Sequence, residues 1–171
     1  MSVSDEMLDV VDEQDRVIGV ERRGDIHARG LMHRAVHILV FNSAGELFLQ
    51  KRSMSKDEQP GKWDTSAAGH LDSGEDYDSC ARREIAEELG IETDEPLERL
   101  FKLPANPETG NEHCMVYRCR YDGPLRLQAD EIDEGAWIGP GEMDRRVERP
   151  APELTAAIVL IWRRYRQSDR G

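Results

Sequence analysis

Residues 69–91, GHLDSGEDYDSCARREIAEELGI, combine a polar loop with a helix-forming segment that carries three carboxylates close together. Glu84, Glu87 and Glu88 are spaced i, i+3 and i+4, so they share one face of a helix. Like charges placed in this way repel each other, and a hard divalent cation such as Mg²⁺ or Mn²⁺, which prefers oxygen ligands, would neutralise them. A solvated acidic helix face is the alternative interpretation of such a run taken alone.

The order of residues in this stretch resembles the Nudix box, G-x5-E-x7-R-E-U-x-E-E-x-G-U. Every specified position is filled, by Gly69, Glu75, Arg83, Glu84, Ile85, Glu87, Glu88, Gly90 and Ile91. The resemblance implies an α/β fold, the Nudix-type α/β/α sandwich with a mixed sheet, and a single Nudix hydrolase domain over residues 1–171.

The same resemblance implies an activity and its residues. Proteins with this box hydrolyse a diphosphate linkage in a nucleotide-type substrate, with water attacking phosphorus. The substrate is either a nucleoside di- or triphosphate or a nucleoside diphosphate linked to another group. Their metal ligands correspond here to Glu84, Glu87, Glu88 and the backbone carbonyl of Gly69, and the implied cofactor is Mg²⁺ or Mn²⁺. Glu75 and Arg83 are expected to form a supporting ion pair in which Arg83 also holds Glu84.

The apolar residues of the segment predict how the helix is anchored. Tyr77, Ala81, Ile85 and Leu89 recur every four residues and form a core stripe beside the carboxylates. The helix is expected to begin near residues 76–78, where acidic side chains favour the positive end of the helix dipole, and to end at Gly90. It would therefore pack on a sheet and present its glutamates at a rim.

Strand and helix patterns alternate over the rest of the chain. A hairpin is predicted from residues 8–11 and 16–21, followed by a loop or short helix over residues 22–32. Further strands are predicted at residues 33–41, 46–52, 97–103, 113–121 and 134–139, with residues 46–52 as the partner of residues 33–41. A C-terminal helix is predicted over residues 153–167, with Leu154, Ile158, Ile161 and Trp162 as its apolar stripe. This interleaving favours a mixed sheet covered by helices.

Composition restricts the partners and the location of the protein. A formal charge of -12 over 171 residues argues against general binding to nucleic acid or to anionic membranes. An acidic protein that binds a small phosphorylated substrate needs local cations, and Arg52 and Lys56 are the candidates for contacting phosphate. The cysteines, Cys80, Cys114 and Cys119, form no CxxC motif, and the N-terminus does not resemble a signal peptide, which together indicate a cytoplasmic protein without a membrane segment.

Residues 33–71 also resemble type 1 isopentenyl-diphosphate isomerase, a relative with the same fold. Such isomerases bind a metal through three histidines and two glutamates. His33 and His70 match two of the histidines, and His27 matches the third with a small gap. Glu112 matches one glutamate, whereas Gly110 occupies the place of the other. Their cysteine corresponds to Ala68, so the thiol for proton transfer at carbon is missing. With its box intact, the chain is expected to be a hydrolase of an isomerase-like branch.

Several alternatives remain open at the level of sequence. An isopentenyl-diphosphate isomerase-like enzyme and a non-catalytic nucleotide-binding module are the alternatives to hydrolysis. The three histidines either form a second metal site with Glu112 or pack as remnants of one. Glu112, Glu131 and Glu134 are rival candidates for a general base or an additional metal ligand, and the oligomeric state is open.

Overall fold

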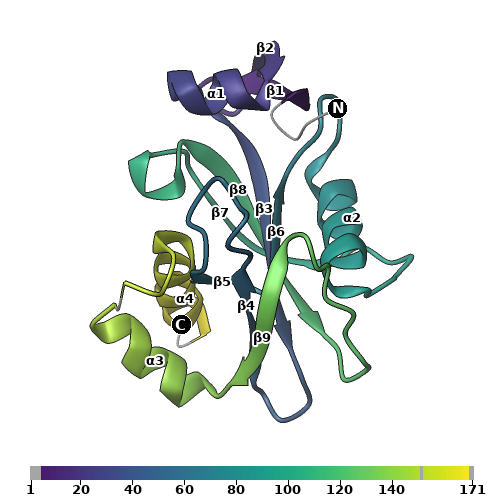
Figure 1. Ribbon diagram of the computed structural model, residues 1–171, viewed down its shortest axis with the longest axis vertical. Coiled ribbons are helices and arrows are strands. Elements are labelled where there is room, and N and C mark those ends of the chain that lie inside the picture. Colours follow the sequence, from purple (N-terminus) through teal and green to yellow (C-terminus); the bar gives the residue numbers. More distant parts are fainter. Residues whose placement is uncertain (1–4, 151, 170–171) are drawn as a thin grey trace.

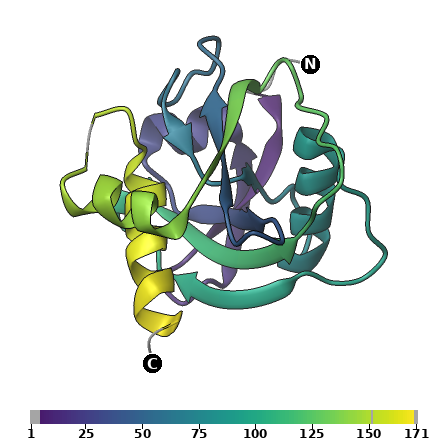
Figure 2. The same ribbon diagram turned by 90° about the horizontal axis from the view of Figure 1, so that it is seen from below.

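The computed structural model describes residues 5–150 and 152–169. Within these residues, seven strands form one mixed sheet, with helix α2 on one face and helices α3 and α4 on the other (Figure 1, Figure 2). The predicted α/β/α sandwich with a mixed sheet is confirmed.

The sheet is built around two long strands, β3 (His33–Phe41) and β8 (Glu112–Arg120), which pair in parallel along their whole length. The other pairings are antiparallel, and the strand order is β5-β4-β3-β8-β7, with β6 paired to β3 and β9 to β4. The remaining strands are β4 (Leu47–Arg52), β5 (Trp63–Asp64), β6 (Ala67–His70), β7 (Glu98–Leu103) and β9 (Ile132–Ile138).

The expected pairing of residues 46–52 with residues 33–41 is only partly correct. β3 and β4 share one registered pair, Phe41↔Leu47, because residues 35–38 of β3 pair with β6 on that side. The long ladder of β4 runs along β9 instead. β4 and β6 therefore pair with the same side of β3 at different points along its length.

Helix α2 (Tyr77–Leu89) follows the local signals closely. Asp76 is its N-cap and accepts a hydrogen bond from the Ser79 backbone N–H at 2.8 Å. Gly90 ends it in the left-handed conformation, at φ 72°. The predicted stripe of Tyr77, Ala81, Ile85 and Leu89 packs against the sheet in a shared apolar cluster.

The opposite face of the sheet carries one expected and one unexpected helix. Helix α4 (Ala156–Asp169) begins after Leu154, which instead bridges to Trp63, but Leu154, Ile158, Ile161 and Trp162 are all buried as predicted. Helix α3 (Pro140–Glu148) was not predicted from the sequence. It begins with proline at its first turn and buries only Met143 and Val147.

Alternation along β3 and β8 divides the core into two layers. Val36, Ile38 and Val40 face the α2 side, whereas Ala35, Leu39 and Phe41 face α3 and α4. In β8, Cys114 and Cys119 likewise belong to opposite layers, and all three cysteines are free, as expected.

The N-terminal segment forms a small unit at one end of the sheet (Figure 1). The predicted hairpin is present as β1 (Met7–Val11) and β2 (Val17–Arg22), and a short helix, α1 (Arg23–Arg29), follows it. Leu8, Val10 and Ile26 form a core of their own there, with Leu31 packed against it. None of the described helices is long and apolar enough to cross a membrane.

Candidate functional site

A cavity of about 700 Å³ collects the candidate site residues. Its walls include residues of α1, β4, β6, α2, β8 and the segment that precedes β9, so regions far apart in the sequence contribute. Eight of the residues to which the sequence gives a catalytic, metal-binding or substrate-binding role line it: Arg52, Lys56, Gly69, Arg83, Glu84, Glu87, Glu88 and Glu112.

The two central carboxylates of α2 are buried. Glu84 is 8% exposed and Glu88 is 4% exposed, and their carboxyl groups interact with each other. Burial raises the pKa of both, and the proximity of Glu84 raises that of Glu88 further, although Arg83 partly offsets the effect on Glu84. Gln50 of β4 donates a hydrogen bond to Glu88 at 2.8 Å. The oxygens of this buried pair are the ligand type that a hard divalent cation takes, and such a cation would favour the ionised form of both groups.

Glu87 differs from its two neighbours. Its side chain is 50% exposed and lies 3.3 Å from Arg83. The expectation that the three carboxylates sit together at an open rim is therefore wrong for Glu84 and Glu88, because β4 and β6 cover that part of the helix face. The site has two inner carboxylates and one outer carboxylate.

Gly69 lies directly against Glu84. A Cβ atom at position 69 would fall no more than 2.6 Å from all three carboxyl atoms of Glu84. Only glycine allows the β6 backbone to approach this carboxylate so closely. The metal-binding role of the Gly69 carbonyl stays a prediction.

Arg83 links the loop of the box to the helix. Its guanidinium binds Glu75 through two hydrogen bonds, of 2.9 and 2.8 Å, and donates a third to Glu84 at 2.7 Å. It also donates to the His70 carbonyl at 3.1 Å. The ion pair expected between Glu75 and Arg83 is present, and the arginine holds Glu84 in place by a charge-assisted bond.

The two candidate phosphate ligands already have acidic neighbours. Arg52 lies 3.6 Å from Asp64 and donates to the Glu58 carbonyl at 3.0 Å, and Lys56 pairs with Glu131. Among the described residues that line the cavity, eleven are acidic and four are basic, namely Arg23, Arg52, Lys56 and Arg83. A phosphate cannot bind favourably in this field unless cations are added to it.

Glu112 lies deeper and contacts histidines. Its Oε1 atom is 2.8 Å from His70 Nε2 and 3.3 Å from His33 Nε2. Burial acts to raise the pKa of Glu112, but the charges and hydrogen bonds of His70 and His33 outweigh it and hold that pKa well below its usual range. The structure thus brings Glu112 and the histidines together at the end of β6, next to Gly69.

The rival glutamates separate in space. Glu131 lies on the cavity wall, whereas Glu134 is exposed on β9 and is not among the described residues that line the cavity. Two further cavity contacts escaped the sequence reasoning, Gln50 beneath Glu88 and Arg23 of α1 beside His70. Gln50 follows an apolar strand run, and Arg23 stands in a basic segment that resembles a solvated loop, so neither carries a local signal.

Comparison with known proteins identifies the class that this fold and box define. The model of the NUDIX domain family matches residues 31–158, and the chain belongs to this family. Its curated relatives are named Nudix hydrolases, and the protein is a Nudix hydrolase. One relative, an uncharacterised Nudix hydrolase of Yersinia pestis, is 37% identical over 97% of this chain and 91% of its own length. Another, from Pseudomonas aeruginosa, is 42% identical over 79% of each chain.

Solved structures share the fold. The crystal structure of DR0079 from Deinococcus radiodurans superposes with a TM-score of 0.82 at 31% identity and covers 93% of this chain and 98% of that chain. The NUDIX domain of Shewanella oneidensis NrtR, solved with ADP ribose, has a TM-score of 0.60 at 15% identity and covers 86% of this chain and 98% of that chain.

Proposed function

We propose that the protein hydrolyses a diphosphate linkage in a nucleotide-type substrate with the help of Mg²⁺ or Mn²⁺. The observation that carries this proposal is the buried pair Glu84 and Glu88, which faces the close-approaching backbone of Gly69 inside the main cavity. Two carboxylates packed together without a metal are costly, and a bound divalent cation removes that cost.

The residues fit a hard divalent metal. The donors on offer are the carboxylate oxygens of Glu84, Glu87 and Glu88 and the carbonyl of Gly69, all of which suit Mg²⁺ or Mn²⁺. When bound, such an ion polarises the phosphoryl oxygens and neutralises their charge. Arg83 keeps Glu84 in one orientation, and Gln50 does the same for Glu88.

The polar residues of the cavity wall have separate roles. Arg52 and Lys56 are proposed to exchange their acidic neighbours for substrate phosphate oxygens. The attacking water needs a base, and the low pKa of Glu112 makes that carboxylate a poor proton acceptor. Glu131, on the wall beside Lys56, is the better candidate for the base, and release of Lys56 to phosphate would free it.

The substrate class is inferred from the kind of linkage that the box cleaves. Two proteins with the same fold are an Ap4A hydrolase of C. elegans and the NrtR NUDIX domain solved with ADP ribose, and those ligands belong to those proteins. They set a useful range of test compounds, which also includes the common nucleoside di- and triphosphates.

The test is a panel of these nucleotides with the purified protein, Mg²⁺ or Mn²⁺, and analysis of whether phosphate or pyrophosphate is released. We expect turnover of at least one compound, and a loss of at least about 10²-fold in kcat in Glu88→Gln. Glu134→Gln is the matched control, because this glutamate is exposed on β9, and it should turn over like the wild type. Full activity in Glu88→Gln would remove the basis of the assignment.

The convergence of His27, His33 and His70 beside Glu112 favours one second candidate, an isopentenyl-diphosphate isomerase-like activity. Ala68 stands in the position of the thiol, and the nearby Cys114 is buried, which raises the pKa of its thiol well above the usual range. We therefore expect no conversion of isopentenyl diphosphate to its dimethylallyl isomer. Conversion by the purified protein would favour the isomerase activity over the hydrolase activity.

A further inference from the structure

The main cavity also reaches the face of the sheet that carries α4. Side chains of the core layer on that face line this part of the cavity, which we call the α4 chamber: Ala35, Leu103, Cys114, Ala157, Leu160 and Ile161. They are small or aliphatic. None of the described residues that line the cavity is phenylalanine, tyrosine or tryptophan.

His37 is a polar residue in the floor of the α4 chamber. Alternation along β3 puts its side chain on the same face as Ala35 and Leu39. It is 5% exposed, yet it lines the cavity. Ala68, directly opposite on β6, lines the cavity as well, and its small side chain leaves room beside the ring.

The hydrogen bonds of Thr65 determine which nitrogen of His37 faces a ligand. His37 Nδ1 is 2.8 Å from Thr65 Oγ1, and that hydroxyl donates its single proton to the Ala67 carbonyl at 3.3 Å. The imidazole must therefore donate from Nδ1, so Nε2 presents its lone pair. Among the described residues, nothing donates a hydrogen bond to Nε2. A buried acceptor of this kind is unfavourable until a ligand donates to it.

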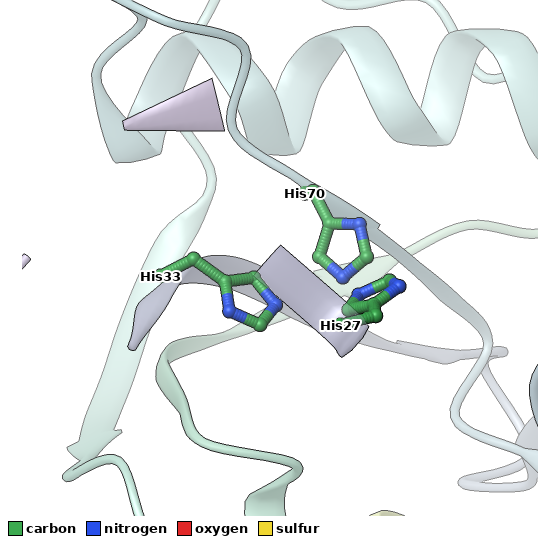
Figure 3. Close-up of side chains that lie close together, drawn as sticks. All are labelled: His27, His33 and His70. Carbon is green, nitrogen blue, oxygen red and sulfur yellow. The ribbon is translucent and has the colours of Figure 1, made fainter. Parts of the chain in front are cut away.

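A second acceptor lies beside this ring. A ring nitrogen of His37, a carboxylate oxygen of Glu112 and the sulfur of Cys114 lie within 4.8 Å of one another. Glu112 also contacts two members of a group of three rings that are turned toward one another in Figure 3: His27, His33 and His70. An imidazole lone pair and a carboxylate therefore meet at the chamber, and together they suit a ligand that donates hydrogen bonds.

The candidate phosphate ligand Arg52 is linked to the same chamber. Arg52 lies 3.6 Å from Asp64, which accepts a hydrogen bond from the Thr65 backbone N–H at 2.7 Å. Thr65 in turn holds His37. A phosphate bound at Arg52 would therefore have the group attached to it close to the His37 ring.

We propose that the α4 chamber binds the ribose of a nucleotide substrate and that a ribose hydroxyl donates a hydrogen bond to His37 Nε2. The proposal rests on the nucleotide hydrolysis proposed above and names a specificity determinant for it. Under this proposal the protein prefers ribonucleotides to deoxyribonucleotides, because a deoxyribose would leave the buried acceptor without a donor.

The lining of the chamber favours the sugar over the base. Nucleobases are commonly held by stacking on aromatic side chains, which the described lining does not offer. A ribose brings hydroxyl donors together with a compact carbon skeleton that suits aliphatic walls. It is also the group, besides the phosphates, that ribonucleoside di- and triphosphates and their conjugates all share.

An ordinary buried histidine is the alternative interpretation. Water could then satisfy Nε2, and the ring would have no influence on the choice of substrate. The two interpretations differ in one measurable quantity, the ratio of kcat/KM for a ribonucleotide to that for its deoxy analogue.

The experiment measures this ratio with the full-length protein and Mg²⁺. The substrates are ADP and CDP, each compared with its 2′-deoxy and 3′-deoxy analogues. We expect at least one of the two deoxy analogues to lower kcat/KM by at least about tenfold for both bases. Calorimetric Kd values for the uncleavable α,β-methylene forms of the same compounds should show the same preference.

A variant connects the preference to the ring. His37→Leu removes the acceptor, so kcat/KM for the ribonucleotide should fall to that for the deoxy analogue and the ratio should approach 1. The ratio does not depend on the fraction of folded enzyme, because both substrates are measured on one preparation. His113→Leu is the matched control, since this buried histidine is not among the described residues that line the cavity, and it should keep the wild-type ratio.

The outcomes separate this proposal from the proposed hydrolysis. Wild-type protein that turns over ribo- and deoxyribonucleotides equally well, with equal Kd values, would overturn the ribose proposal and leave hydrolysis intact, whatever the variants do. A preference that persists in His37→Leu would overturn it as well, and so would a wild type that neither binds nor hydrolyses these compounds. Binding that prefers the ribose form without any turnover would support the ribose proposal and refute hydrolysis.

Discussion

The metal-binding role proposed for Glu88 requires an ionised carboxylate in a buried position, which lowers the stability of the fold. Glu88 is 4% exposed, contacts Glu84, and accepts a hydrogen bond from Gln50. Burial and the adjacent carboxylate raise its pKa well above the usual value. A group whose pKa is higher in the folded state stabilises the fold below its unfolded pKa of about 4.3, and this contribution is lost as the pH rises through the folded value.

We predict that Glu88→Gln stabilises the metal-free protein at neutral pH. Glutamine keeps the shape and cannot ionise, so the free energy of unfolding should rise by about 1–2 kcal/mol at pH 8 and change less at pH 5. Urea unfolding in the presence of a chelator at both pH values measures this. Glu87→Gln, at a half-exposed neighbour, should change the free energy by no more than about 0.5 kcal/mol. A Glu88→Gln variant less stable than the wild type at pH 8 would contradict the prediction.

Metal affinity should depend on pH for the same reason. The raised pKa values of Glu84 and Glu88 mean that a proton must leave before a divalent ion can bind. We expect the Kd for Mn²⁺ to fall by up to about tenfold per pH unit as the pH rises toward the folded pKa, and then to level off. Calorimetric titrations in buffers of different ionisation enthalpy would count the released proton, and a Kd that is independent of pH would refute this account.

At the level of elements, the close approach of β6 to α2 decides the shape of the site. Strand β6 pairs with β3 through the register Val36↔Gly69, which fixes the depth at which its backbone passes α2. The stripe of Ala81, Ile85 and Leu89 fixes the helix on the other side. Glu84 therefore has only the space that the absent side chain of Gly69 leaves.

We predict that Gly69→Ala displaces the Glu84 carboxylate and lowers kcat by at least about 10²-fold. The added methyl group would meet carboxyl atoms within 2.6 Å, and such overpacking costs about 1–3 kcal/mol. Steady-state kinetics at saturating Mn²⁺ measure the loss. Gly139→Ala is the matched control, because a Cβ there meets nothing within 4 Å. Wild-type turnover in Gly69→Ala would show that this close approach has no role in the site.

At the scale of the whole molecule, one largely buried carboxylate joins the N-terminal hairpin to the sheet and to α2. Asp15 accepts hydrogen bonds of 2.7 Å from Arg34 of β3 and from Tyr77 of α2, and it pairs with Lys102 of β7. Burial acts to raise the pKa of Asp15, but these three donors outweigh it and lower the pKa. Such a group stabilises the fold above its unfolded pKa of about 3.9, and the contribution is lost as the pH falls through the lower folded value.

We predict that Asp15→Asn lowers the free energy of unfolding by about 3 kcal/mol at pH 7, because Arg34 and Lys102 would lose their counter-charge. The difference from the wild type should shrink as the pH falls below about 4. Chemical denaturation at several pH values measures both effects. Glu142→Gln removes an exposed carboxylate that pairs with Arg145 and Arg146, and it should leave the free energy of unfolding nearly unchanged. Equal stability losses in the two variants would contradict the distinction between buried and exposed charge.

The parts of the fold that could be predicted are those with local signals. The cap at Asp76, the four-residue stripe and Gly90 define α2 within one segment, and the apolar run of residues 33–41 defines β3. Helix α3 was missed because its apolar positions are few, Met143 and Val147. The pairing of β4 with β9 was missed because it joins residues about eighty positions apart, and strand pairing at that range depends on which edge other strands have already taken.

The sequence by itself determined the family and the placing of three carboxylates on one helix face, since the spacing of Glu84, Glu87 and Glu88 along one helix is a local property. Only the tertiary structure decided that Glu84 and Glu88 are buried while Glu87 is exposed, because the covering strands β4 and β6 come from elsewhere in the chain. It also decided that His27, His33 and His70 come together and that Glu112 contacts His33 and His70. The physical reason is that helix spacing fixes which residues share a face, whereas burial and convergence depend on which distant elements pack against that face.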